Sequence, residues 1–178
     1  MLNNEKEITK KALTILQAIY SMGNINKKVL PLNDEYKTDS PFEYFHMPDI
    51  YPIVYEDTIC KIIELSILLR REKEFLDDCK ENINTKVKFS NIGKYVNTNE
   101  DVSFSKSLSK IVHAKSIELQ SKDKKDNIGY GYTIDRNCEF TGVLRIGVIE
   151  IDKSYSTIDI NIEKFCINAM MLFAKVSC

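Results

Sequence analysis

The longest helical pattern of hydrophobic positions in the chain runs from Glu56 to Ile83. Apolar residues recur there at three- and four-residue steps, which places them along one broad side of a helix. These residues are Ile59, Ile62, Ile63, Leu65, Leu68, Leu69, Phe75 and Leu76. Acidic residues and Thr58 begin the stretch, as a helix amino terminus favours, and charge is dense from Arg70 onward. We therefore expect a central core helix, buried by several partners over its first four turns, with a solvent-exposed carboxy-terminal end.

Three further segments have helical spacing. The first covers residues 4–22 and is expected to end at Gly23 and Asn24, because a glycine often follows the last helical turn. Its expected buried side consists of Ile8, Ala12, Leu13, Ile15, Leu16, Ile19 and Tyr20. The second runs from about Val102 to Lys115, preceded by a brief helix near Asn91–Val96. The last lies within residues 162–176, and its expected inward residues are Phe165, Cys166, Ala169, Met170, Leu172 and Phe173.

Beyond Ile117 the apolar period changes to two, which is typical of strands. A strand is expected near residues 117–121, with the following SKDKKDN as a polar turn. Residues 143–151 and 156–162 are rich in β-branched alternation, so we predict that Val143–Ile151 pairs with Ser156–Ile162 in an antiparallel hairpin that leads into the last helix. The expected fold class is α+β: a mainly α-helical bundle with a small antiparallel hairpin or sheet in the C-terminal third, as a single domain over residues 1–178.

All four prolines fall between Gly23 and Tyr55, interleaved with aromatic residues. Prolines at such spacing predict an ordered, extended connection rather than a helix. Two uses are open for its aromatic side chains. They pack on the core, or Phe42, Tyr44 and Phe45 form a partner-binding surface.

The composition adds few constraints. A net charge of −1 with 29% charged residues does not indicate a nucleic-acid or membrane-surface protein, although ten lysines against five acids between Lys80 and Lys125 leave a local basic face open. No stretch approaches eighteen uninterrupted apolar residues, and MLNNEKEITKK lacks the apolar core of a signal peptide, so we expect a cytoplasmic protein with no membrane partner. Five cysteines without CxxC spacing indicate a reducing compartment. With two histidines and no clustered ligands, no metal site or other cofactor is expected.

Candidate chemistry is concentrated in KSLSKIVHAKS, residues 106–116. An imidazole at His113 could act as a general acid or base on a ribose hydroxyl, and Lys106 or Lys110 could hold a phosphate. The alternative is a structural histidine that sits on an amphipathic helix and hydrogen-bonds a carbonyl.

This segment resembles the motif of the HEPN superfamily of small helical bundles. Ribonuclease members of that superfamily carry an arginine followed by four to six residues and a histidine, assembled across a dimer. Here Lys106 precedes His113 with six residues between them, so a lysine stands where the superfamily has arginine. Lysine offers a point charge where arginine grips a phosphate in two places. Arg70 and Arg71, at the charged end of the long helix, could supply the missing guanidinium as phosphate-binding residues; otherwise they are solvated surface charges.

Three functional interpretations follow. The first is a non-catalytic interaction protein with a HEPN-like helical core, which binds a protein partner in bacterial or phage conflict (defence, immunity or anti-defence). It is favoured because the motif is incomplete. The alternative is a metal-independent HEPN-type ribonuclease that uses His113 with Lys106 or Lys110, has RNA as its partner and acts as a homodimer. Nucleic-acid binding without cleavage through residues 80–125 is a weaker third interpretation, because the net charge is near zero.

Overall fold

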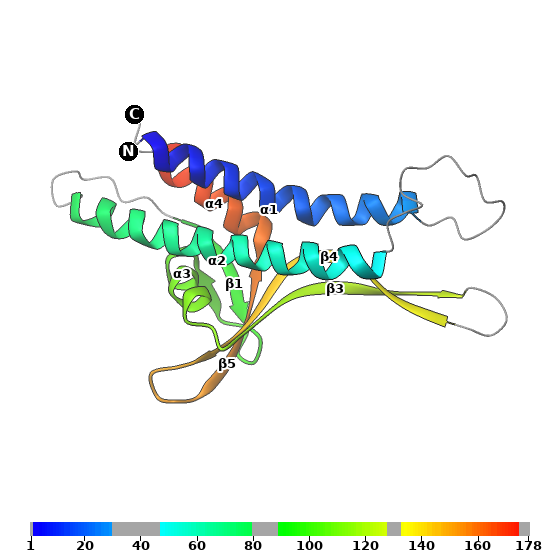
Figure 1. Ribbon diagram of the computed structural model, residues 1–178. Coiled ribbons are helices and arrows are strands. Elements are labelled where there is room, and N and C mark those ends of the chain that lie inside the picture. The colour runs from blue at the N-terminus through cyan, green and yellow to red at the C-terminus, as the bar shows by residue number, and fades with distance from the viewer. Residues whose placement is uncertain (1, 30–46, 80–88, 128–132, 175–178) are drawn as a thin grey trace.

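The structure is a computed structural model that describes residues 2–29, 47–79, 89–127 and 133–174 (Figure 1). The helices are α1 (Leu2–Val29), α2 (Met47–Cys79), α3 (Phe104–Val112) and α4 (Ile162–Ala174). The strands are β1 (Asn91–Tyr95), β2 (Asp101–Ser103), β3 (Ser116–Asn127), β4 (Thr133–Ile149) and β5 (Tyr155–Asn161). The expected α+β class is confirmed. The expected helical bundle is wrong, because the described helices pack against a five-stranded sheet, and that sheet already begins at Asn91 rather than in the C-terminal third.

The sheet is antiparallel throughout, with strand order β2-β1-β5-β4-β3. The predicted hairpin is confirmed: β4 and β5 pair from Val143 opposite Asn161 to Ile149 opposite Tyr155, and β5 leads directly into α4. The brief helix predicted near Asn91–Val96 is wrong. That segment is β1, which satisfies its backbone groups by pairing with β2 on one side and β5 on the other.

The predicted polar turn SKDKKDN is also wrong, because these residues continue β3 as far as Asn127 opposite Thr133. In Figure 1, β3 and β4 extend as a two-stranded ribbon beyond the rest of the sheet. Residues 121–127 are polar throughout, so their hydrophobic pattern predicted a turn rather than a strand.

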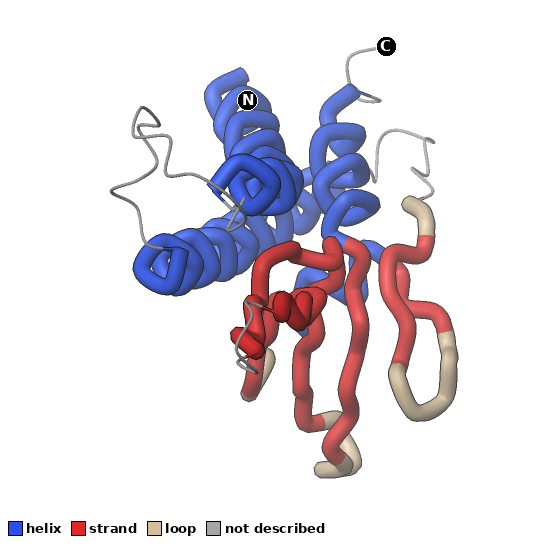
Figure 2. Tube along the Cα trace, turned by 90° about the vertical axis from the view of Figure 1, so that its right-hand side faces the viewer, coloured by secondary structure: helices blue, strands red, loops and turns tan. Residues whose placement is uncertain are grey.

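Helices gather on one side of the sheet, as Figure 2 shows. The sheet face turned toward them carries fully buried side chains, among them Leu144, Ile146, Ile158 and Ile160. They join buried residues of all four helices in one core. The helical residues of that core are Ile8, Ala12, Ile15, Ile19, Ile62, Leu65, Leu69, Phe104, Leu108, Ile111, Ile162, Phe165, Cys166, Ala169 and Leu172.

The opposite face of the sheet, here called the outer face, carries a row of charges that alternates in sign from strand to strand. Residues directly opposite each other on neighbouring strands share a face. The pairing places Glu118, Arg145, Asp159, Lys94 and Asp101 in one row across all five strands. Arg145 donates two hydrogen bonds to Asp159, at 2.7 and 2.8 Å, and this contact raises the pKa of the Arg145 guanidinium. The row explains why this face remains in water.

Two predicted helix boundaries are wrong. α1 continues through Gly23 and Asn24 to Val29. α2 begins at Met47, so it includes residues 47–55, which were expected to be extended, and it contains Pro52. Pro52 is the sixth residue of α2, so it removes one i→i−4 hydrogen bond from the second turn while the helix continues. Residues 30–46 lie outside the described residues.

α2 is amphipathic rather than buried on most sides. Ile62, Leu65 and Leu69 are buried, whereas Ile67 is 52% exposed and Cys60 is also exposed. The helix packs against α1, α3 and β3, which cover one side of it. The same holds for α1, where Leu13 and Tyr20 are exposed although both were expected in the core. No helix within the described ranges is both long and apolar enough to cross a membrane.

Candidate functional site

α3 carries the candidate residues along one stripe of its surface. The helix predicted over residues 102–115 is confirmed, with the narrower bounds Phe104–Val112. The Ser103 hydroxyl caps its start by accepting a hydrogen bond from the backbone N–H of Lys106 at 3.3 Å, and His113 is the C-cap. Lys106, Lys110 and His113 follow one another at steps of four and three residues, so they share one side of the helix. Lys110 lies in the last turn, near the negative end of the helix dipole, which stabilises positive charge there.

His113 contacts Arg70 of α2. The Nη1 atom of Arg70 lies 3.0 Å from Nε2 of the exposed His113 ring, between residues that are 43 positions apart in the sequence. A guanidinium only donates hydrogen bonds, so Nε2 must accept and the ring proton must be on Nδ1. The structure therefore brings a guanidinium to the histidine from a different helix. Arg71 is exposed at the next position of α2.

The two candidate lysines are engaged by other residues. Lys110 Nζ donates to Glu150 at 2.5 Å, and the Tyr95 hydroxyl donates to the other carboxylate oxygen at 3.0 Å. Lys106 Nζ lies over the Tyr95 ring, 5.0 Å from its centroid. The hydrogen bond from Lys110 is the main cause that holds the pKa of Glu150 below its ordinary value, and the charge of Lys106 contributes. These four residues, here called the Glu150 cluster, tie α3 to β1 and to the end of β4.

Glu150 and Tyr95 were not singled out in the sequence, although they decide where the lysines point. Glu150 is 40 positions from Lys110 and 55 from Tyr95. The local sequence around Glu150 shows only an acidic residue directly after the apolar Ile149, at the end of the alternating pattern. From the sequence alone, an acidic residue at the end of a strand is most simply interpreted as a solvated surface charge. The register of the sheet must be known before its neighbours on other strands can be named.

The chemistry available at His113 is limited by this arrangement. Lys106 is seven residues away along α3, which corresponds to about 10 Å of helix rise. A phosphate held by Lys106 would therefore lie far from the imidazole, and Lys110 is committed to Glu150. Arg70 remains the cation in contact with His113. An anion bound at this helix end would also face the negative end of the dipole.

A shallow hollow of about 440 Å³ opens elsewhere, on the outer face beside β1. Its lining includes Lys94 and Lys164 together with Asp101 and Asp159. Charges of both signs therefore border the hollow, and the Asp159 carboxylate is already held by Arg145. This balance does not favour a ligand of either charge.

The predicted partner-binding residues Phe42, Tyr44 and Phe45 lie outside the described residues. Among the residues that the structure does describe, no three histidine, cysteine, aspartate or glutamate side chains gather as a metal ion would require. Comparisons with protein-family models, with curated proteins and with solved structures found no match to this chain.

Proposed function

We propose that this chain is a non-catalytic interaction protein that acts by binding a protein partner. The observation that carries the proposal is the Glu150 cluster. Lys106 and Lys110, the lysines that a ribonuclease of this type would present to a phosphate, instead pack on Tyr95 and pair with Glu150. A lysine held by a partly buried carboxylate is a poor phosphate ligand, because an incoming phosphate must first displace that carboxylate. The setting in bacterial or phage conflict rests on the HEPN resemblance.

In this proposal His113 has a structural role. It ends α3 and accepts a hydrogen bond from Arg70, which joins the carboxy-terminal parts of α2 and α3. Loss of such a hydrogen bond costs about 0.5–1.5 kcal/mol, so His113→Ala should lower the melting temperature by roughly 1–6 °C. Nitrogen chemical shifts of the His113 ring should report the Nδ1–H tautomer in the wild type and a shift toward Nε2–H in Arg70→Ala.

The deciding experiment is a cleavage assay on fluorescent single-stranded RNA in the presence of EDTA. The proposal predicts no cleavage above the level of His113→Ala, together with a lower melting temperature for that variant. Cleavage by the wild type that falls by about 10²–10⁴ in His113→Ala, with normal folding, would refute the proposal.

A metal-independent ribonuclease is the second candidate, and the Arg70–His113 contact favours it. The resemblance calls for a guanidinium near the histidine, and Arg70 places one 3.0 Å from the ring. His113 would act as general base and Arg70 would hold the phosphate. Arg70 would have to leave Nε2, so that this nitrogen can accept the ribose proton.

Arg70→Lys separates the two candidates, with Arg71→Lys as the matched control on the neighbouring exposed position. Lysine keeps the charge and one donor but loses the planar fork. A ribonuclease should lose at least tenfold in rate in Arg70→Lys and little in Arg71→Lys. In an interaction protein both variants should bind the partner as the wild type does.

A further inference from the structure

The turn between β4 and β5 presents an apolar tip to solvent. Ile151 is 104% exposed, which means that its side chain has no protein cover. Ile149 and Tyr155, directly opposite each other where the two strands end, are 53% and 59% exposed. In Figure 1 this turn is the orange loop that projects from the sheet, away from the helices. Ile149, Ile151 and Tyr155 are here called the hairpin tip.

The backbone of the hairpin tip is held by its own hydrogen bonds. Glu150 N–H donates to the Ser154 carbonyl at 2.8 Å, and Lys153 N–H donates to the Glu150 carbonyl at 3.0 Å. The Asp152 carboxylate accepts from both the N–H and the hydroxyl of Ser154, and these bonds lower the pKa of Asp152. Lys153 adopts a left-handed φ of 68° to close the turn. The polar groups of the turn thus bond to one another, and an ordered turn presents Ile151 to water.

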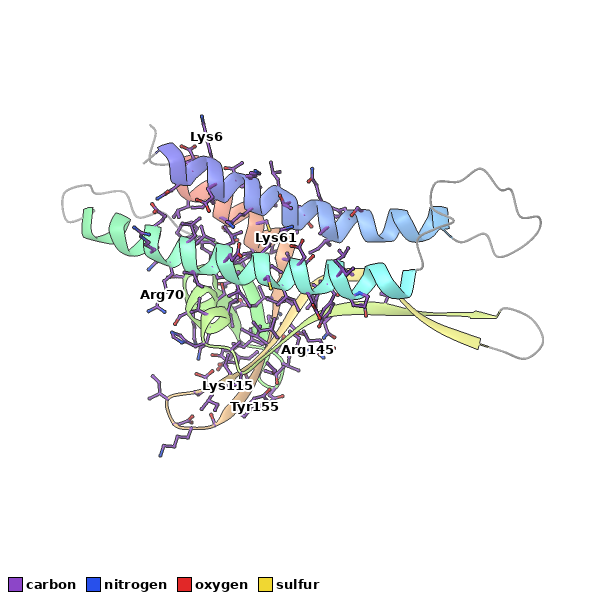
Figure 3. All side chains as sticks on the ribbon, viewed as in Figure 1. Lys6, Lys61, Arg70, Lys115, Arg145 and Tyr155 are labelled. Carbon is purple, nitrogen blue, oxygen red and sulfur yellow. The ribbon has the colours of Figure 1, made fainter. Side chains whose placement is uncertain are left out.

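Tyr155 is also fixed in place. Its ring crosses β4 at Gly147, where an added Cβ would lie only 1.8 Å from the tyrosine oxygen and 2.6 Å from Cζ. The tyrosine oxygen is 3.1 Å from Oγ of Ser116. Figure 3 shows Tyr155 close to Lys115 at this end of the molecule. A tyrosine held in one position loses little conformational entropy on binding, and such residues are common anchors of protein interfaces.

Positive charge predominates around the hairpin tip. Lys153 lies in the turn, and the backbone N–H of Lys115 bonds to the Gly147 carbonyl at 2.8 Å. Lys106 and Lys110 both act on Glu150 at the base of the turn. These four lysines outnumber the two acids of the turn, Glu150 and Asp152. Glu150 already accepts bonds from Lys110 and Tyr95, and Asp152 from Ser154. A partner that complements this charge is acidic where it meets the tip.

We propose that the hairpin tip is the docking surface for a protein partner that has an apolar pocket bordered by carboxylates. This inference rests on the proposed function and identifies the surface that performs it. Ile151 fills the pocket, Ile149 and Tyr155 pack around it, and Lys115 and Lys153 meet the acidic border. A protein pocket fits this tip better than a lipid surface, because three side chains on one narrow turn offer a small, shaped contact and little depth of insertion.

The test uses the photo-crosslinking residue benzoylphenylalanine, placed at position 151 of the full chain in its own cells. The same residue at position 53 is the control, because Ile53 of α2 is similarly exposed, at 68%. We expect an adduct with an acidic protein from position 151 and none from position 53. The purified adduct partner should bind the wild-type chain, and its Kd should rise at least tenfold for Ile151→Ser and also with added salt. Ile53→Ser should keep the wild-type Kd. Both serine variants should keep the wild-type melting temperature, because Ile151 has no protein cover and Ile53 is mostly exposed.

Several results would overturn the inference. A partner captured from position 53, but not from position 151, would leave the proposed function intact and reject the hairpin tip. Absence of an adduct from both positions would reject both. An adduct with a second copy of the chain, or Ile151-dependent binding to vesicles with about one-third phosphatidylserine, would assign the tip to self-association or to a membrane instead. A purified partner that binds Ile151→Ser as tightly as the wild type would also reject it.

Discussion

Replacing Glu150 by glutamine tests the Glu150 cluster directly. The change keeps the size of the side chain and one acceptor oxygen for Tyr95, but it removes the charge that pairs with Lys110. Hydrogen bonds to charged groups contribute roughly 1.5–3 kcal/mol. The Lys110 and Glu150 side chains are 18% and 23% exposed, so water weakens the pair somewhat. We therefore expect a loss of about 1–2 kcal/mol at pH 7, which lowers the melting temperature by roughly 2–8 °C.

The loss should depend on pH in a direction fixed by the Glu150 pKa. Lys110 lowers this pKa below its ordinary value of 4.5, so the folded protein binds the proton less readily than the unfolded chain. The stabilisation is then fully present above pH 4.5 and is lost as the pH falls through the lowered value.

The assay is thermal unfolding of wild type and Glu150→Gln between pH 7 and pH 3. Their melting temperatures should differ at pH 7 and converge toward pH 3. Glu56→Gln, at an exposed position of α2, controls for the change in net charge. A difference that stays constant over this range would show that the charge of Glu150 is not what stabilises the cluster.

Three further predictions follow from burial and close approach. Leu65→Ala should cost about 2–5 kcal/mol in urea unfolding, whereas Ile67→Ala on the same helix should stay within about 0.5 kcal/mol, because Leu65 is buried and Ile67 is half exposed; equal losses would contradict the observed orientation of α2. Gly147→Ala should lower the free energy of unfolding by about 1–3 kcal/mol, because the added methyl group forces the Tyr155 ring aside, and by less in a Tyr155→Ala background. Additive losses in this double-mutant cycle would argue against the clash. Burial raises the pKa of the Cys166 thiol to about 12, so peptide mapping after brief treatment with a thiol reagent should find Cys60 modified and Cys166 unmodified; rapid labelling of Cys166 would show that α4 opens readily.

Helical spacing predicted the buried side of α2 and α4 well, because apolar residues recur every three or four positions where one side of a helix packs against the core. Ile62, Leu65 and Leu69 are buried as expected. The same pattern could not show that the opposite side of α2 has no cover, where Ile67 and Cys60 are exposed. An apolar residue on a surface helix looks the same in a sequence as one in a central helix.

The strands were predictable only where one face is buried. β4 and β5 alternate because Leu144, Ile146 and Ile158 point into the core. β1 is five residues long, and its neighbours in the sheet are not all its neighbours in sequence: β5 is more than fifty residues further along the chain. At Gly93 an added Cβ would lie 2.7 Å from the Asp159 carbonyl oxygen, so glycine is needed there for the close approach of the two strands. In the sequence alone, the same glycine lay within the brief helix predicted near Asn91–Val96.

The candidate site was predictable as a group of residues on α3 but not as a set of contacts. The sequence placed Lys106, Lys110 and His113 on one helix, and it offered Arg70 as a guanidinium from elsewhere. It could not show that Arg70 reaches His113, because that contact depends on how α2 and α3 pack. It also could not show that Glu150 holds Lys110, because that contact depends on the register of the sheet.

The register also determines which part of the sheet is available to a partner. On the outer face each charge of the alternating row has an opposite charge on the neighbouring strand, and Arg145 and Asp159 bond directly. A partner that covered this row would have to remove water from those charges, and their existing pairs would offer it little in return. At the hairpin tip the polar groups are satisfied within the turn, whereas the side chain of Ile151 has no cover. Burial of Ile151 removes apolar surface from water without breaking any hydrogen bond. The physical balance therefore favours binding at the tip over binding at the charged face.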